Sequence, residues 1–264
     1  MTVDLWLRFQ GDPPRRILRF EPAVPTEHRL VIRWHAGIGL VDGPCPIERL
    51  TILCQATRKV SSDIALSVAV EEVDIENAAE LTPGTRRGAE EALAKFQAFA
   101  RETRFSDRGA YDGGPRFMAL TRLLESVFRC PLPFESVGIG AQWEAQAVVD
   151  DLRLPLTETI RYHLVALSDE TLEIGFRSAG AVADLDPPRI RRGGEIVRGV
   201  ERKWSASGSM KRDLRSAHPS RFQQESKWEA LDLVRRRGKT TREGWFVGEK
   251  IFADAQVPES GKAR

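Results

Sequence analysis

The stretch ETIRYHLVALSDETLEIGFRSAG, residues 158–180, gives the strongest indication of the fold. It consists of two runs in which apolar and polar residues alternate, joined by Ser168 and Asp169. The apolar residues that share one parity are Ile160, Tyr162 and Leu164 in the first run and Leu172, Ile174 and Phe176 in the second. Every second residue of a strand points to the same face of a sheet. The stretch therefore predicts an antiparallel β-hairpin with one face in the core and the other in water.

Two earlier stretches show the same alternation. In HRLVIRWH, residues 28–35, one face contains Leu30, Ile32 and Trp34, while Arg29 and Arg33 fall on the other. Residues 48–72 repeat the strand-turn-strand pattern, and their apolar positions are Leu50, Ile52, Cys54, Ile64, Leu66, Val68 and Val70. The likeness of this segment to residues 158–180 suggests a duplication of roughly 110 residues, although short alternating runs also resemble each other by chance.

Two segments change to the helical period. Residues 86–103 and 116–129 each place apolar side chains three or four positions apart, and Pro115 precedes the second segment as a residue favoured in a first helical turn. Together with the alternating runs, they predict a mainly β protein of the α+β class, built on one or more curved antiparallel sheets. A duplicated β-meander with helices between its halves is one arrangement that fits.

The order of these patterns divides the chain into four parts. Residues 1–26 form an extended N-terminal segment, because four of the fifteen prolines fall within residues 11–26. Residues 27–130 form a β-rich half with two helices, residues 131–253 a second β-rich half, and residues 254–264 a flexible tail. The length of 264 residues is compatible with one large β domain or two smaller ones.

The junction between the halves, PLPFESVGIGAQWEA at residues 131–145, predicts a helix exit, an extended link, a glycine turn and a strand. Gly138 and Gly140 supply the turn. Trp143 shares a face with Ala145, Ala147 and Val149. We therefore expect Trp143 to be a core residue that buries about 200 Å².

Several of these segments resemble an uncharacterised family of bacterial envelope proteins, many of them predicted lipoproteins, that is classed as a domain of unknown function. The resemblance extends over residues 12–235 and includes RRILRF, SVGIGAQWE, RYHLVALSDETLEI and SASGSM. Its most specific motif consists of Pro133, Val137, Gly138, Gly140, Ala141 and Trp143. The family has no established activity, so the resemblance implies an envelope protein and assigns no catalytic residue.

The N-terminus, MTVDLWLRFQ, lacks a basic segment followed by an apolar one, and no later run is apolar enough to span a membrane. The chain as written is expected to be cytoplasmic, and a true start further upstream would place it in the periplasm or cell envelope. Cys45, Cys54 and Cys130 match no zinc or redox spacing, so we expect buried or bystander thiols.

Catalytic and cofactor signatures are absent from the sequence. His28, His35, His163 and His218 are scattered, and no nucleophile elbow or zinc-binding motif occurs. His163 falls on the polar face of its strand, where we expect it to face solvent. The glycines of residues 138–140 lack the third glycine and following helix of a dinucleotide loop. These patterns predict a protein without an enzymatic role, a cofactor or a metal ion.

Basic residues concentrate late in the chain, where residues 189–242 hold sixteen Lys and Arg against six Asp and Glu. The candidate contacts for a polyanion are Arg191, Arg192, Arg235, Arg236 and Arg237. Trp204, Trp228 and Trp245 alternate with these cations. The alternation predicts that tryptophans point inward and arginines outward, so that the two kinds do not share a surface.

These observations leave two functions from different classes. The first is a non-enzymatic β-structured envelope or interaction module, with an apolar ligand or a protein as its partner. A curved sheet partly covered by two helices would hold an apolar ligand in its concavity. The alternative is polyanion binding through residues 189–242, to nucleic acid or an anionic lipid surface, with nucleic acid the less favoured partner. Salt dependence distinguishes them, because only a polyanion site weakens steeply with salt.

Overall fold

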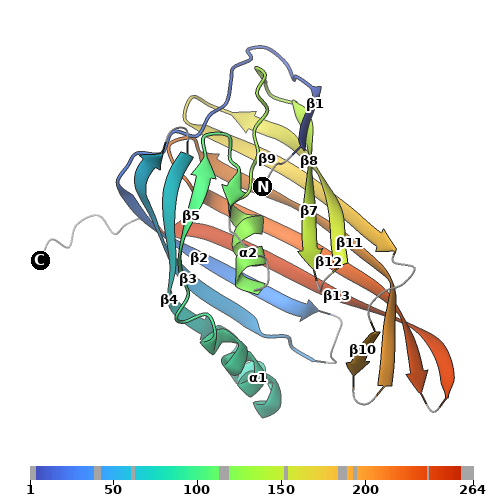
Figure 1. Cartoon of the computed structure of the whole chain (residues 1–264). Helices are drawn as coiled ribbons and strands as arrows, with labels where there is room; N and C mark the ends of the chain where they lie inside the picture. Colours follow the sequence, from blue (N-terminus) through green and yellow to red (C-terminus); the bar gives the residue numbers. More distant parts are fainter. Residues whose placement is uncertain are drawn as a thin grey trace, which may run out of the picture.

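The computed structural model describes residues 4–38, 43–60, 63–112, 119–151, 154–183, 189–192, 195–236 and 238–256. Within these ranges the chain forms a thirteen-stranded antiparallel sheet that does not close, together with two α-helices (Figure 1). The expected α+β class is therefore confirmed. None of the helices in the described ranges is long and apolar enough to cross a membrane.

The strands of the N-terminal half are β1 (Asp4–Phe9), β2 (Thr26–Ile38), β3 (Ile47–Val60), β4 (Asp63–Ile75), β5 (Ala100–Ser106) and β6 (Tyr111–Asp112). Those of the C-terminal half are β7 (Gln142–Asp151), β8 (Leu154–Leu167), β9 (Thr171–Ala183), β10 (Arg189–Arg192), β11 (Glu195–Asp213), β12 (Pro219–Arg236) and β13 (Lys239–Gln256). A 3-10 turn η1 (Ala78–Glu80) precedes helix α1 (Pro83–Ala94), and helix α2 (Ala119–Phe128) lies between the two halves in the chain.

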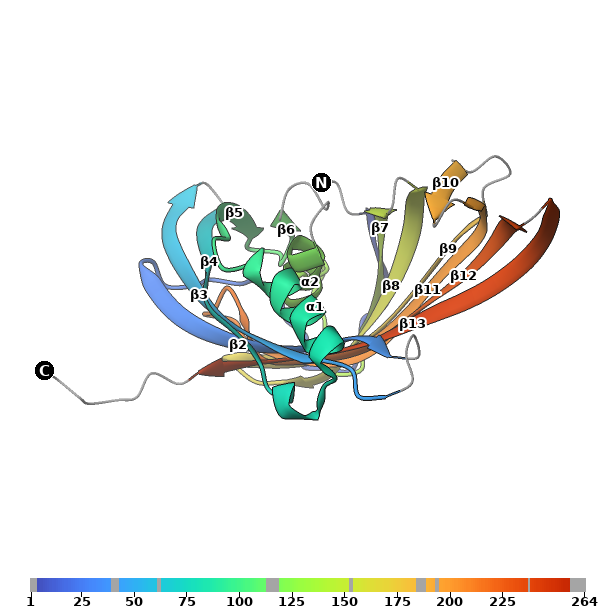
Figure 2. The same cartoon turned by 90° about the horizontal axis from the view of Figure 1, so that it is seen from below.

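The two halves of the chain form one continuous sheet. Its order is β1-β7-β8-β9-β11-β12-β13-β2-β3-β4-β5-β6, with β10 paired to β11 beside this path. Strand β13 joins the halves by pairing with β2, so that Ile251 lies opposite Trp34 and Ala253 opposite Ile32. The sheet curves into a trough, and α2 lies between its raised edges (Figure 2), while α1 lies near the ends of β3 and β4 (Figure 1).

Helix α2 crosses the concave face because of its place in the chain. It follows β6, at one edge of the sheet, and precedes β7, next to the other edge, so the connection has to span the trough (Figure 1). Its buried residues are Leu120, Leu123, Leu124, Val127 and Phe128. Burial of these side chains against the sheet removes the apolar surface of both layers from water.

Alternation decides which side chains reach the core. The apolar positions expected to face inward are buried at Leu30, Ile32, Leu50, Ile52, Cys54, Ile64, Leu66, Val68, Val70, Ile160, Tyr162, Leu164, Leu172, Ile174 and Phe176. On the opposite face, Arg29 pairs with Glu71 and Arg33 with Glu76, at 2.8 Å in each case. The period of two therefore predicted both faces of these strands correctly.

The helix expected at residues 86–103 is present, but it begins and ends earlier in the chain than expected. Helix α1 begins earlier, at Pro83, where the Thr82 hydroxyl caps it by accepting a hydrogen bond from the backbone N–H of Thr85. It ends at Ala94, and β5 starts at Ala100, opposite Ala69 of β4. Pairing with β4 satisfies the backbone of the last predicted turn, which overrides its helical spacing.

The junction at residues 131–145 folds as expected. Trp143 is fully buried, donates from Nε1 to the Pro131 carbonyl at 2.8 Å, and stacks on Tyr162 with ring centroids 5.6 Å apart. A Cβ at Gly138 would lie 1.8 Å from the Asp12 carbonyl oxygen, and Gly140 has a φ of +85°. Val137 and Ala141 are also fully buried. Packing and backbone geometry thus account for the motif.

Candidate functional site

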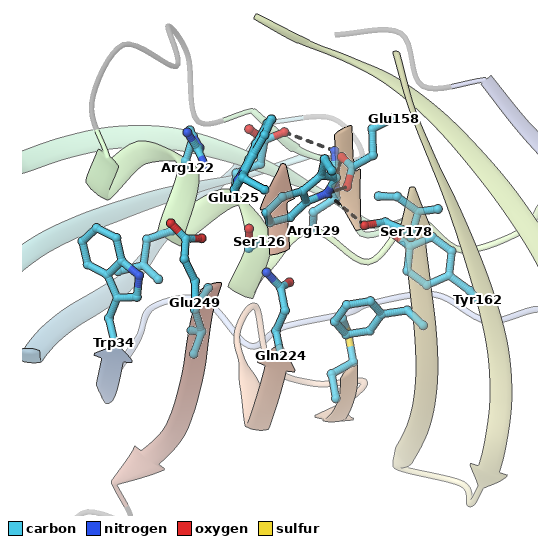
Figure 3. Close-up of a pocket in the computed structure, with 17 residues that line it drawn as sticks. Trp34, Arg122, Glu125, Ser126, Arg129, Glu158, Tyr162, Ser178, Gln224 and Glu249 are labelled. Carbon is cyan, nitrogen blue, oxygen red and sulfur yellow. Dashed lines mark hydrogen bonds and ion pairs between the residues drawn. The ribbon is translucent and has the colours of Figure 1, made fainter. Parts of the chain in front are cut away.

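A cavity of about 260 Å³ lies between α2 and the concave face of the sheet (Figure 3). Arg122, Leu123, Glu125 and Ser126 of α2, followed by Arg129, line its roof. The apolar side chains that line it from the sheet are Ile160, Phe176, Met210 and Ile251. Polar and aromatic side chains from β2, β8, β9, β11, β12 and β13 complete the lining.

Strand register explains why this space is open. One row across the sheet consists of Ile160, Ser178, Ala206, Ser226 and Glu249, so that three small side chains occupy its centre. Helix α2 therefore covers the sheet without filling the volume above this row. The cavity is a consequence of small residues at matched positions of β9, β11 and β12.

The next row depends on a glycine. Gly208 lies opposite Phe176 on one side and Gln224 on the other. A Cβ at Gly208 would lie 2.6 Å from the Phe176 ring and 2.1 Å from the Gln223 carbonyl oxygen. Glycine thus lets the Phe176 ring lie flat over β11, where it forms part of the cavity floor.

A tryptophan pair forms one wall of the cavity. Trp204 and Trp228 lie opposite each other on β11 and β12, with ring centroids 4.6 Å apart. From the roof, the Arg122 guanidinium lies 5.2 Å from the centre of the Trp228 ring. A cation over an indole ring is an attractive contact, so this pair ties α2 to the wall.

A buried cluster of charges closes one end of the cavity. The Arg129 guanidinium donates from Nη2 to Glu158 Oε2 at 2.8 Å, and its Nη1 lies 3.5 Å from Glu125 Oε1. Trp204 donates from Nε1 to Glu158 Oε1 at 3.0 Å and to the Ser178 hydroxyl at 3.1 Å. Helix α2 is thereby linked to β8, β9 and β11 through a single carboxylate.

The environment of this cluster keeps both partners charged. Burial by itself raises the pKa of Glu158, but the charge of Arg129 and hydrogen bonds from Arg129, Ser178 and Trp204 bring that pKa below its ordinary value. Burial lowers the pKa of Arg129, yet the nearby Glu158 carboxylate is the main influence that raises it overall. The ion pair therefore persists at neutral pH.

Three polar groups of the cavity lining have no partner among the described residues. The Gln224 side chain is 5% exposed, makes no hydrogen bond there, and directs its amide from the floor toward α2 (Figure 3). The indole nitrogens of Trp34 and Trp228 are buried and also unpartnered. Buried donors and acceptors are rarely left unpaired in proteins. Of the three, only the Gln224 amide is accessible from the cavity, because surrounding atoms seal off both indole nitrogens.

Glu48 lies next to this region, opposite Trp34 in the pairing of β2 and β3. Its Oε2 is buried without a hydrogen-bond partner within the described part of the chain. Burial raises the pKa of Glu48 to about 7. The folded state thus binds a proton at this carboxyl over a pH range in which the unfolded chain has lost it.

We expect Glu48→Gln to stabilise the fold at pH 8 and to leave its stability at pH 5 nearly unchanged. A carboxyl pKa raised in the folded state favours folding at low pH, and that contribution is lost as pH rises from about 4.5 through 7. The stability difference between variant and wild type should grow by about 1–3 kcal/mol across that range. Urea unfolding of both proteins at each pH measures it, and a difference independent of pH would contradict the proposed protonation.

His218 also titrates differently in the folded state, because burial lowers its pKa to about 4. A lowered histidine pKa destabilises the fold as pH falls from about 6.5 through 4, which is opposite in sign to the effect of Glu48. Both proteins compared above carry His218. Its contribution therefore cancels in their difference.

The candidate polyanion contacts lie away from the cavity. Arg235 is exposed, Arg191, Arg192 and Arg236 are described only by their backbone positions in β10 and β12, and Arg237 lies outside the described residues. Arg191 is opposite Ile196, which is opposite Arg235. Strand pairing thus brings Arg191 and Arg235, which are far apart in the sequence, to the same end of the sheet.

The expected separation of tryptophans from cations holds where side chains are described. Trp204 and Trp228 line the concave cavity, while Lys203 and Lys227, their neighbours in the chain, are exposed. The side chain of Trp245 lies outside the described part. The cation that does contact Trp228, Arg122, comes from α2 and not from the basic segment.

The structure brings together two histidines that are far apart in the sequence, and it buries two of the three cysteines. His163 is exposed as expected, and His28 contacts His218 with ring centroids 4.5 Å apart. Cys54 and Cys130 are buried free thiols, and burial raises the pKa of Cys130 to about 11. Among the residues that the structure describes, no three His, Cys, Asp or Glu side chains are grouped to hold a metal ion.

The polar residues of the cavity were not among the predicted site residues. Two of them, however, occupy strand positions at which the sequence pattern predicts burial. Glu158 lies on the same face of its strand as Ile160 and Tyr162, because an even number of positions separates them. Gln224 likewise lies on the same buried face of its strand as Phe222 and Trp228. A polar residue in phase with apolar neighbours faces the core and needs a partner there. For Glu158 that partner is Arg129, 29 positions earlier in the chain.

No protein-family model matches the chain, and no curated protein is significantly similar to it. Evidence for its function therefore comes from the cavity and from the charge distribution. The resemblance to envelope proteins remains an expectation from the sequence.

Proposed function

We propose that the protein is a non-enzymatic binding module that takes a small amphipathic molecule into the cavity between α2 and the sheet. The single observation that carries this proposal is the lining of the cavity, which combines apolar and aromatic walls with the Gln224 amide that reaches the cavity from its floor (Figure 3). Ligand sites in proteins have this composition, mostly apolar with a few convergent polar groups.

The size of the cavity sets the size of the ligand. At about 260 Å³, the cavity lies just below the usual range of about 300–1,000 Å³ for ligand pockets. A small molecule with an apolar body and a compact polar end satisfies this limit. We therefore propose ligands of about ten to twenty non-hydrogen atoms rather than long-chain lipids enclosed along their full length.

Binding of the uncharged fluorescent probe N-phenyl-1-naphthylamine tests the proposal. We expect a saturable increase in probe fluorescence that changes little between low and moderate salt, because burial of apolar surface is the main driving force. Ser126→Phe places a ring at a roof position of the cavity and should weaken probe binding by about tenfold or more.

Ser220→Phe is the matched control, because Ser220 is an exposed serine of β12 outside the cavity lining. It should leave probe binding unchanged. Absence of saturable binding, or equal loss in both variants, would contradict a ligand site between α2 and the sheet.

Polyanion binding is the second candidate, and the backbone register favours it at one end of the sheet. Arg189 lies opposite Arg198, which is opposite Leu233, and Leu233 is opposite Arg242. The pairing row two positions further along contains Arg191 and Arg235. Five arginine positions thus gather at the end formed by β10, β11, β12 and β13.

We expect the wild-type protein to bind single-stranded nucleic acid and anionic vesicles only weakly, and to release both near physiological salt, where the Debye length is about 8 Å. Reversal of Arg235, Arg236 and Arg237 to Glu is expected to leave folding nearly intact, because an exposed charge such as that of Arg235 contributes little to stability. A saturable complex that survives this salt and is abolished by the triple reversal would favour the polyanion function instead.

A further inference from the structure

We propose that the ligand carries a neutral hydrogen-bonding head, such as an amide, ester or alcohol, and that Gln224 binds this head. The inference rests on the proposed function and adds the chemical class of the ligand. It excludes a free carboxylate as the preferred head.

Gln224 is the residue of the cavity floor best placed for this role. Its side chain is almost fully buried, its amide points into the cavity, and no described residue pairs with it (Figure 3). The neighbouring inward residue on the same strand differs, because the Ser226 hydroxyl donates to Glu249 Oε2 at 3.3 Å. An amide that faces the cavity without a partner among the described residues can hydrogen-bond a ligand that enters it.

The arrangement of neighbours leaves the amide accessible from the cavity alone. Gly208, opposite Gln224 on β11, has no side chain that could reach it, and Ile251, opposite on β13, is apolar. Because an amide both donates and accepts hydrogen bonds, Gln224 matches a neutral head that does the same.

Charge in the cavity disfavours a carboxylate head. The described lining contains three carboxylates, Glu125, Glu158 and Glu249, against two guanidiniums, Arg122 and Arg129. Arg129 lies between Glu125 and Glu158, so its charge is already compensated by two anions. A further buried anion would lie close to these carboxylates in a region of low dielectric, where repulsion between like charges is strong.

Displacement of the bound naphthylamine probe by ten-carbon compounds with different heads tests this inference. At pH 8, we expect decanamide and decanol to bind about tenfold or more tightly than decanoate, which is fully ionised there. Gln224→Leu should weaken decanamide binding by about threefold to tenfold, the range for one lost hydrogen bond, with little change in affinity for the probe itself.

Gln223→Leu is the matched control, because Gln223 is the exposed neighbour on β12 and pairs with Ser209 on the outer face. It should change neither affinity. Gln224→Leu should also raise the melting temperature of the unliganded protein, since an apolar side chain replaces an unpartnered buried amide. A purely structural Gln224 would instead lower the melting temperature when replaced.

The outcomes separate this inference from the function on which it rests. If the probe binds but decanoate competes as well as decanamide, or if Gln224→Leu weakens all compounds equally, the proposed head group is wrong and the ligand site stands. If neither the probe nor any ten-carbon compound binds in a saturable way, both proposals fail.

Discussion

Trp143→Ala is expected to lower the free energy of unfolding by about 3–5 kcal/mol, the range for removal of a large buried aromatic side chain. Trp143 is fully buried, stacks on Tyr162, and donates to the Pro131 carbonyl in the segment that leaves α2. Alanine would leave a cavity at the start of β7 and an unpaired carbonyl above it. Urea unfolding at neutral pH measures the loss.

Trp6→Ala is the matched control, because Trp6 is 41% exposed on β1 at the edge of the sheet. Its replacement should cost less than about 1 kcal/mol, as surface substitutions usually do. Equal losses for the two variants would show that Trp143 does not anchor the junction between the halves.

Arg129→Met should also destabilise the protein by about 3–5 kcal/mol, because it removes one partner of a buried ion pair. Glu158, only 5% exposed, would lose its closest charged donor, and Glu125 would lose the same cation. Methionine preserves much of the side-chain volume, so the loss reports charge more than packing. Chemical unfolding at pH 7 checks the magnitude.

The pH dependence of this variant distinguishes an electrostatic loss from a packing defect. Without Arg129, burial dominates and raises the pKa of Glu158 above its unfolded value, so the variant should regain stability as pH falls from 7 toward 5. Adding Glu158→Gln should restore part of the loss at pH 7. A penalty that does not change with pH or with the second substitution would assign the effect to packing.

Arg86→Met provides the control for the ion pair. Arg86 pairs with Glu90 one turn along α1 at 2.7 Å, but both side chains are about half exposed. Such pairs contribute about 0.3–0.5 kcal/mol. The contrast between Arg86 and Arg129 isolates the effect of burial on otherwise similar arginine–glutamate contacts.

Local patterns predicted the strands well because alternation depends only on the two faces of each strand. Leu50 and Ile52, or Ile160 and Tyr162, reveal their burial without knowledge of neighbouring strands. The order of the strands in the sheet cannot be predicted from such local patterns. The pairing of β13 with β2, which joins the two ends of the chain in the middle of the sheet, depends on contacts more than 200 positions apart in sequence.

The candidate site was less predictable for the same reason. Its roof comes from α2, its wall from β11 and β12, and its charged end from Arg129 and Glu158, so no single segment contains its pattern. A polar residue at an inward position, as at Gln224, indicates that something polar is needed in the core. It does not identify the partner, which only the assembled sheet and helix reveal.

The most direct test of the ligand site is quenching of tryptophan fluorescence by a decanol brominated at its chain end. Bromine quenches indoles only at close contact, and Trp34, Trp204 and Trp228 line the cavity. We expect saturable quenching in the wild-type protein and its loss when these three tryptophans are replaced by phenylalanine. Absence of saturable quenching in the wild type, or undiminished quenching in the variant, would contradict binding between α2 and the sheet.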